Sequence, residues 1–446
     1  SWLENPTRRY PVSCTVFVCR DTMDEDPDGL EGAFQFVSKA LRYGAGVSVH
    51  LSQLRAKGTE NEHGMVASGP CGFMEIFSKF NEILRRGGQY RNGAVVCHLD
   101  ADHKDLLEFL NYDRSRIPWL KRCVNVEPEI VNEPDKLAAI MNAARRGDVW
   151  IVKKQYDKNG DRIYSNVCQE ILLKSRDTCL LNHINLGICK VEDIPQAFED
   201  GMRFLCELYK QTEVEDSGIY VHKDKQVGLG VLGLANLLAI EGVAYKDFVQ
   251  ALQYTNLGVY NGVTKPGAIS EALLEGFKRA AAVAEEHGMS RAFTVAPTAS
   301  CAYRYQDREG YTTTPEIAPP VSLEVDRDSA TLGVQSYKFN PKCETAEKVG
   351  WDVFFELNSE WQRLMNSTGK AHAISMNWWS DMTTMDRNFM ARWINSPLKS
   401  LYYSLQVIPD TQDKTDIYAA LKDVDVDDYL AEILEESDPV QCDCAE

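Results

Sequence analysis

The sequence lacks the features of several protein classes. No uninterrupted apolar run approaches the roughly 20 residues that a membrane-spanning helix needs, and the opening SWLENPTRRY has no apolar signal-peptide segment. There is no CxxC pair and no cluster of His and Cys at zinc spacing, so we expect no metal site. Basic residues are also few, with 48 Lys and Arg against 66 Asp and Glu and a net charge of −18. Because such a chain repels nucleic-acid backbones, we expect neither a nucleic-acid nor a membrane partner.

The composition is that of a large folded protein. The 446 residues are 44% hydrophobic, enough for one large core or two to three smaller ones. The thirteen cysteines are odd in number and scattered, unlike the dense pattern of a disulfide scaffold. This pattern predicts a reducing, cytoplasmic location, in which special cysteines are catalytic or redox-active.

Hydrophobic periodicity predicts alternating strands and helices. The apolar segments at 14–19 and 93–99 are typical of buried strands, and 73–86 carries apolar side chains at helical spacing. The second half is more helical, with amphipathic segments at 194–212 and 270–289. Alternation of this kind indicates an α/β fold with parallel strands.

Residues 228–233 read GLGVLG and match the GxGxxG pattern of dinucleotide-binding proteins. That pattern requires a strand running directly into the first glycine. The preceding HKDKQV forms a poor buried strand. We therefore expect these glycines to allow close packing at the start of a helix, and we expect no binding of a nicotinamide cofactor.

The segment SNVCQEI at 165–171 places three chemically distinct side chains at alternate positions. In an extended chain Asn166, Cys168 and Glu170 lie on one face. An amide, a thiol and a carboxylate on one face form a candidate reactive site. The alternative is a buried structural cysteine with two polar neighbours at a turn.

Several other motifs follow one another along nearly the whole chain. They are VSCTVFVCRDTMD, GAGVSVHLSQLR, SGPCGF, RGGQYRNGA, NVCQE, TCLLNHINLG, PTASCAYRYQD with PEIAPP, and LKSLYYSLQV. In type and order they resemble the catalytic large subunit of ribonucleotide reductases, in a compact class I-like form without the ATP-cone domain. The chain departs from the family where Val167 and Gln169 replace a proline and a glycine of the loop around Cys168.

The resemblance implies a particular architecture. The fold class is α/β, a ten-stranded α/β barrel of two parallel five-stranded halves that run antiparallel to each other. The loop of Cys168 passes through its centre as a finger. Residues 1–408 would form this barrel, and residues 409–446 an acidic tail.

The implied reaction is reduction of ribonucleotides to 2′-deoxyribonucleotides, which requires abstraction of a 3′-hydrogen, loss of water and two electrons. Cys168 would carry a thiyl radical, Glu170 would take the proton of the 3′-hydroxyl, and Asn166 would orient the ribose oxygens. Cys14 and Cys179 would supply the electrons and become a disulfide at each turnover. The alternative for this pair is two ordinary buried cysteines.

The resemblance also implies nucleotide sites. The substrate residues are Ser13, Pro297, Thr298, Ala299, Ser300 and Cys301, whose alternative role is an ordinary helix N-cap. The residues for nucleoside triphosphate effectors are Asp21, Arg55 and Arg91. Without an ATP cone we expect no separate on/off site.

Two radical sources fit the sequence. Tyr402 and Tyr403 resemble a relay that receives the radical from a ferritin-like small (beta) subunit, whose metal or tyrosyl cofactor generates it. In that case this chain holds no permanent cofactor. The alternative is adenosylcobalamin bound beside Cys168, and for the tyrosines an aromatic pair in a strand.

The remaining expectations concern partners. Cys442 and Cys444 in the tail would re-reduce the catalytic pair by thiol–disulfide exchange and be reduced by thioredoxin or glutaredoxin. A homodimer, formed with effector, and a place in DNA replication follow from the resemblance. A nucleotide-binding regulatory protein without chemistry is the remaining functional alternative.

Overall fold

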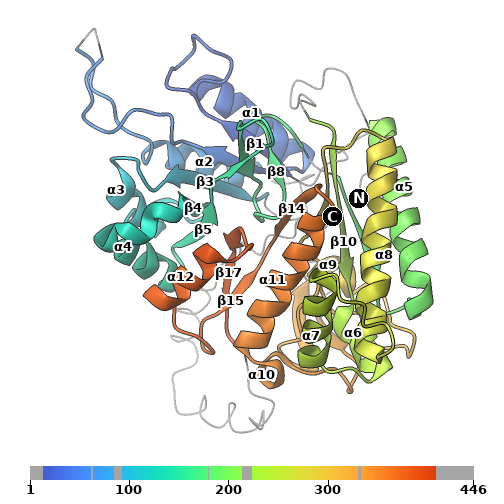
Figure 1. Ribbon diagram of the computed structural model, residues 1–446. Helices are drawn as coiled ribbons and strands as arrows, with labels where there is room; N and C mark the ends of the chain where they lie inside the picture. Colours follow the sequence, from blue (N-terminus) through green and yellow to red (C-terminus); the bar gives the residue numbers. More distant parts are fainter. Residues whose placement is uncertain are drawn as a thin grey trace.

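Figure 1 shows a computed structural model of the chain, which describes residues 14–61, 64–84, 93–178, 180–212, 224–329 and 333–407. The predicted tail at 409–446 lies outside the described residues. Within the described ranges, no helix is long and apolar enough to cross a membrane.

The first half of the chain alternates strands and helices and builds a sheet in the order β1-β2-β3-β4-β5-β16. The strands are β1 (Cys14–Val18), β2 (Gly46–His50), β3 (Val95–Asp100), β4 (Lys121–Val126), β5 (Val149–Lys153) and β16 (Ser400–Leu401). The connecting helices are α1 (Leu30–Tyr43), α2 (Phe73–Ile83), α3 (Leu106–Leu110), η2 (Arg114–Arg116), η3 (Pro128–Asn132) and α4 (Pro134–Arg145). Strands β1 to β5 are parallel, as the alternation predicted, and β16 is antiparallel to β5.

The second half builds a parallel sheet in the order β14-β11-β10-β9. Its strands are β9 (Leu181–Asn185), β10 (Gln226–Leu232), β11 (Arg291–Val295) and β14 (Ala371–Ile374). The helices are η4 (Val191–Asp193), α5 (Ile194–Thr212), α6 (Leu234–Glu241), α7 (Tyr245–Asn256), α8 (Lys265–Glu286), α9 (Ala299–Ala302), α10 (Ala346–Val349), α11 (Trp351–Ser367) and α12 (Arg387–Asn395). Helices α5 and α8 pack along each other beside this sheet (Figure 1). The helix predicted at 194–212 is confirmed as α5, and most of the one predicted at 270–289 lies in α8.

Three small sheets complete the described strands. They are the hairpin of β12 (Glu324–Ser329) with β13 (Gly333–Lys338), the parallel pair β15 (Asn377–Trp379) with β17 (Tyr403–Leu405), and the group β6 (Gln155–Tyr156), β7 (Arg162–Ser165) and β8 (Leu172–Leu173). The β7–β8 hairpin carries the segment that contains Cys168.

The two large sheets meet along both edges. At one edge β16 pairs with β5, while the Ser400 hydroxyl donates to the Ile374 carbonyl of β14 at 2.8 Å. At the other edge a single antiparallel bridge joins Thr15 of β1 to Thr178, just before β9. The structure therefore confirms an α/β fold with parallel sheets. The described strands form two sheets rather than one continuous ladder, so a closed ten-stranded barrel is not shown.

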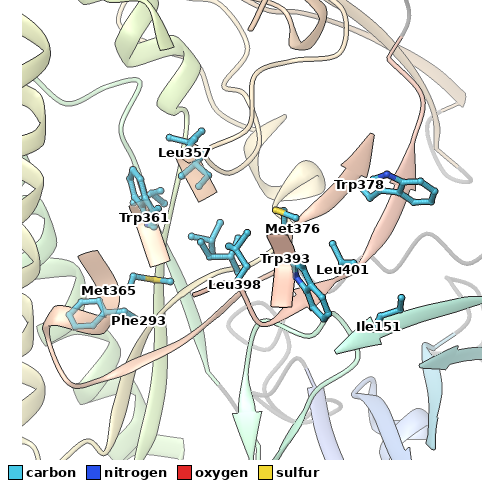
Figure 2. Packing of buried hydrophobic residues seen from close by; sticks show 14 of the residues in the cluster. Ile151, Phe293, Leu357, Trp361, Met365, Met376, Trp378, Trp393, Leu398 and Leu401 are labelled. Carbon is cyan, nitrogen blue, oxygen red and sulfur yellow. The ribbon is translucent and has the colours of Figure 1, made fainter. Parts of the chain in front are cut away.

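A continuous apolar core joins the two halves (Figure 2). It runs from Ile151 of β5 past Leu401 of β16 to Phe293 of β11 and Trp361 of α11, all of them buried. Burying such large side chains typically contributes about 1.5–3 kcal/mol each. This packing fixes the two sheets against each other and so fixes the space between them.

The interpretation of GLGVLG as a helix start was wrong for its first two glycines. Residues Gln226–Leu232 form β10, which is buried throughout and passes through Gly228 and Gly230 before Gly233 precedes α6. A Cβ on Gly228 would lie 2.9 Å from the Ile171 side chain. The glycine thus admits the Cys168 segment against the strand. The sequence did not indicate this strand, because pairing with the flanking strands β9 and β11, rather than local propensity, makes this polar-led segment a strand.

Candidate active site

The finger loop, defined as residues 166–171, connects β7 to β8 and is fully buried. Its two ends are closed by hydrogen bonds, because the backbone N–H of Asn166 donates to the Ile171 carbonyl at 3.0 Å and the N–H of Ile171 donates to Asn166 Oδ1 at 3.1 Å. The N–H of Gln169 donates to the Asn166 carbonyl at 3.2 Å and completes the turn. The Asn166 side chain is therefore partly a structural element of this loop.

Gln169 occupies a backbone conformation that favours glycine. Its φ is +67°, in the left-handed region, where a side chain costs about 1–2 kcal/mol. The related family has glycine at this position. Here the Gln169 Nε2 donates to the sulfur of Cys123 on β4 at 3.1 Å. The replacement thus keeps the turn and adds a contact to the first sheet.

The other side of the finger loop is held by the second sheet. The Glu170 carbonyl accepts from the Ala373 N–H at 2.9 Å and from the Thr294 hydroxyl at 3.0 Å. The Ser375 hydroxyl donates to the Cys168 carbonyl and lies 3.5 Å from Glu170 Oε2. Hydrogen bonds from both sheets therefore hold the finger loop and limit its movement.

A buried cluster between the sheets surrounds Cys168. Its members are Cys14, Val96, Cys123, Trp150, Val152, Val167, Cys168 and Tyr402, with Ala94 and Tyr403 packed against them. The structure thus brings together Cys14, Cys168 and Tyr402, which are far apart in sequence. Cys123 and Trp150 also belong to this site and were missed by the sequence reasoning. Side chains on their strands point alternately to two faces that are both buried. No alternation of polar and apolar residues therefore marks the positions that face Cys168.

The cysteines of this cluster differ in redox state. Cys168 is part of a disulfide bond, whereas Cys14 and Cys123 are thiols. A radical on sulfur requires the Cys168 thiol, so this form must first be reduced. The predicted pairing of Cys14 with Cys179 stays a prediction, because Cys179 lies outside the described residues.

Two buried carboxyl groups have raised pKa values. Burial raises the pKa of Glu170 to about 7, although the neighbouring polar side chains of Asn166 and Ser375 oppose the shift. Burial also raises the pKa of Glu316 to about 8, and the negative charge of Glu170 adds to this. An acid that titrates near neutrality suits proton transfer. Glu316 lies within the motif PEIAPP but was not among the predicted site residues.

Glu316 lies against the predicted phosphate segment. Its backbone N–H donates to the hydroxyl of Thr298 at 2.8 Å, and Thr298 is fully buried. The segment leads into α9, a helix of four residues, and Ser300 and Cys301 are half-buried. The Thr298 hydroxyl therefore fixes the turn in this structure. A role in phosphate binding stays a prediction.

The tyrosine pair forms an aromatic path to the cluster. The ring centroids of Tyr402 and Tyr403 are 6.2 Å apart, and those of Tyr402 and Trp150 are 4.7 Å apart. Tyr402 is buried and Tyr403 half-buried. The pair therefore extends the site around Cys168 toward the protein surface.

A buried polar network supports the start of the finger loop. The rings of His50 and His98 stack with centroids 4.0 Å apart, and His50 Nε2 lies 3.3 Å from the Ser165 carbonyl. Burial lowers the pKa of His98 to about 4 and that of His50 well below its ordinary value. Both rings are thus neutral at pH 7. Beside them the Arg162 guanidinium binds both oxygens of Asp100, at 2.5 and 2.7 Å.

Two of the predicted effector residues contact each other. The backbone N–H of Arg55 donates to Asp21 Oδ1 at 3.1 Å, and its Nε donates to Asp21 Oδ2 at 2.8 Å. Their side chains are 35% and 37% exposed. They follow β2 and β1, two neighbouring strands, which explains how residues 34 positions apart meet. Their accessibility is compatible with a nucleotide site.

We predict that Arg55→Ala changes the free energy of unfolding by at most about 1 kcal/mol, because the ion pair is partly exposed. The same change should weaken binding of a deoxyribonucleoside triphosphate by about tenfold or more, since arginine–phosphate contacts are strong. Calorimetric titration measures this. Arg20→Ala is the matched control, because Arg20 forms a similar surface pair with Asp26. Equal effector affinity in the two variants would exclude Arg55 from the effector site.

The remaining predicted residues cannot be placed. Ser13, Arg91, Cys179, Cys442 and Cys444 lie outside the described residues.

Residues 12–128 and 152–258, about half of the chain, match the family model described as ribonucleotide reductase, barrel domain. The chain belongs to the ribonucleotide reductase family. The resemblance of the motifs to this family is thereby confirmed.

The chain is similar to several named enzymes. It is 26% identical over 266 residues to a vitamin B12-dependent ribonucleoside-diphosphate reductase of Mycobacterium tuberculosis, covering 49% of this chain and 38% of the relative. It is 25% identical over 269 residues to the protein of the same name from Thermoplasma acidophilum, covering 50% of this chain and 35% of that relative. This chain thus spans less than two fifths of the length of these curated relatives.

A solved structure shares the fold. The class Id ribonucleotide reductase alpha subunit of Actinobacillus ureae matches with a TM-score of 0.63 at 18% identity, covering 89% of this chain and 84% of that one. At this identity the match supports the fold of the reductase chain rather than its radical source.

The prediction of a radical cofactor in a partner subunit was wrong. The curated relatives of the reductase chain are named vitamin B12-dependent enzymes. The error arose from the tyrosine pair, because LKSLYYSLQV was read as a relay. Two adjacent tyrosines also serve as packing around Cys168, where Tyr402 lies against Trp150.

Proposed function

We propose that the chain reduces ribonucleotides to 2′-deoxyribonucleotides through a thiyl radical on Cys168. The observation that carries the proposal is the finger loop itself, which holds Asn166, Cys168 and Glu170 fully buried between the two sheets. The family membership supports the same activity. The names of the relatives support a ribonucleoside diphosphate as the substrate.

The proposed reaction uses each of these side chains at a defined atom. The Cys168 sulfur radical removes the 3′-hydrogen of the ribose, and Glu170 takes the proton of the 3′-hydroxyl. Asn166 holds the ribose oxygens through its Nδ2, which has no partner among the described residues. The 2′-hydroxyl then leaves as water, with a proton from a thiol.

Two electrons and a hydrogen at C2′ balance the reaction. We propose that Cys14 and Cys179 supply them and form a disulfide, after which Cys168 returns the hydrogen to C3′. Exchange with Cys442 and Cys444 and then with thioredoxin or glutaredoxin would restore the dithiol. The position of Cys14 in the cluster around Cys168 supports this assignment.

The residues present fit adenosylcobalamin as the radical source. Half-buried Tyr403 offers one accessible aromatic ring, which packs against the tilted ring of buried Tyr402 beside the Cys168 cluster and suits apolar contact with a large cofactor. When bound, adenosylcobalamin supplies the radical through homolysis of its cobalt–carbon bond. Tyr402 and Tyr403 would hold it, and the apolar cluster would exclude water from the radical site.

An assay tests the activity and its radical source. We expect the chain, reduced with a dithiol, to form 2′-deoxyribonucleotide when adenosylcobalamin is added, and none without it. Tyr402→Phe should retain activity, because stacking needs the ring but no hydroxyl. Chromatography of the nucleotides measures the product. Absence of product with adenosylcobalamin, or loss of activity in Tyr402→Phe, would contradict this radical source.

The partners and regulation are part of the same proposal. Nucleoside triphosphates would bind at Asp21, Arg55 and Arg91 and select the substrate, and a homodimer would form with them. The two edge contacts between the sheets support a closed ten-stranded barrel.

A further inference from the structure

Three polar atoms of the finger loop are buried without a hydrogen-bond partner in the described part of the chain. They are Asn166 Nδ2, Gln169 Oε1 and Glu170 Oε1. A buried polar atom left unpaired is costly and uncommon in folded proteins, so such atoms point to a ligand. The proposed reaction uses Asn166 and Glu170. It assigns nothing to Gln169, which replaces a glycine of the related family.

The Gln169 side chain is held in one orientation. Gln169 is fully buried, and its Nε2 donates to the Cys123 sulfur at 3.1 Å. Since an amide is planar, anchoring the nitrogen also fixes the oxygen. The left-handed backbone at φ +67° directs this side chain away from an ordinary extended path. A strained residue whose amide oxygen is fixed and unpaired is a candidate substrate contact.

The position of Cys123 indicates which part of the substrate is contacted. Cys123 on β4 belongs to the same buried cluster as Cys14 on β1 and Cys168. In the proposed reaction Cys14 belongs to the dithiol on whose side the 2′-oxygen leaves. The Gln169 amide is therefore anchored within the cluster that holds both Cys14 and Cys168, the two sulfurs that act on the ribose in the proposed reaction. Its Oε1 is an acceptor and requires an O–H or N–H donor.

We propose that Gln169 is a substrate-contacting residue whose Oε1 accepts a hydrogen bond from the ribose 2′-hydroxyl. Cys123 acts through it as a positioning residue. The inference rests on the proposed function. A site that pairs a buried acceptor with a substrate hydroxyl rejects the analogue lacking that hydroxyl, because the acceptor is then left unpaired.

The test compares binding of a ribonucleoside diphosphate with that of its 2′-deoxy counterpart. Dissociation constants are measured by calorimetry on the full chain, reduced with a dithiol and without adenosylcobalamin, so no radical chemistry is involved. Wild type should prefer the ribonucleotide. Gln169→Gly should reduce this preference by about tenfold, chiefly through weaker binding of the ribonucleotide. Gln169→Met, which keeps the size but lacks the acceptor, should do the same.

Two further variants separate positioning from packing. Cys123→Ser keeps an acceptor for Nε2 and should retain the preference, whereas Cys123→Val should lose part of it. Cys97→Val is the matched control. Cys97 is a buried thiol on neighbouring β3, and its side chain belongs to the large apolar core rather than to the cluster around Cys168. If both Gln169 variants keep the wild-type preference for the ribonucleotide, the inference about Gln169 is wrong, whereas the proposed function is unaffected. Failure of wild type to bind either nucleotide would instead contradict the proposed function.

Discussion

Cys168→Ser should abolish deoxyribonucleotide formation, lowering kcat by at least about 10³-fold, as expected for loss of the residue on which a reaction depends. A serine O–H bond is too strong for a radical to be made and used in the way that a thiol allows. Serine fits the same buried space with little change in volume. The measurement is product formation under reducing conditions with adenosylcobalamin.

The control for this variant is nucleotide binding. Affinity for the ribonucleoside diphosphate should stay within about twofold of wild type, because serine fits the same space and the proposed binding atoms belong to other residues. Cys97→Ser, made at a buried thiol on β3 outside this cluster, should retain turnover. Activity that survives in Cys168→Ser would leave the chain as a nucleotide-binding protein whose chemistry lies elsewhere.

Glu170→Gln should lower kcat by about 10²–10⁴-fold, the usual contribution of a general base. In wild type kcat should rise with pH and level off above pH 7, because burial raises the Glu170 pKa to about 7 and only the ionised form accepts the proton. The residual activity of the variant should lose this dependence. A pH–rate profile measures both effects, and a profile that keeps the same midpoint in the variant would assign the titration to another group.

The same substitution should raise stability at alkaline pH. The Glu170 carboxyl has a pKa of about 7 when folded against an ordinary value of 4.5, so the folded state binds its proton more tightly. Stability from this group is present below about pH 4.5 and is lost as the pH rises to about 7. Removing the charge with glutamine should therefore increase the free energy of unfolding at pH 8, by an amount of the order of 3 kcal/mol. Denaturant unfolding at pH 5 and pH 8 measures the difference.

The sequence was sufficient for the elements whose local pattern and burial agree. Helix α5 was predicted to the residue, since its apolar face repeats at helical spacing over nineteen residues. Strand β10 was missed, because Gln226 and two glycines carry no strand propensity and only the flanking strands bury them. The meeting of the two sheets depends on contacts such as Ser400 with Ile374, which periodicity cannot report.

The site was predictable where residue type reports the chemistry. Asn166, Cys168 and Glu170 stand out because an amide, a thiol and a carboxylate alternate in seven residues. Cys123, Trp150 and the stacked histidines were not predictable, since no local pattern distinguishes them on their strands and each gains its role from residues that are distant in sequence. The prediction of the radical source was wrong because two adjacent tyrosines look the same in a sequence whether they transfer a radical or only pack against their neighbours.

The most direct measurement is the reaction of a ribonucleoside diphosphate mixed with its 3′-deuterated form, using the reduced chain and adenosylcobalamin. If Cys168 removes the 3′-hydrogen, 2′-deoxyribonucleotide forms and the unlabelled substrate is consumed faster than the deuterated one. Absence of product, or equal consumption of the two forms, would contradict a thiyl radical on Cys168.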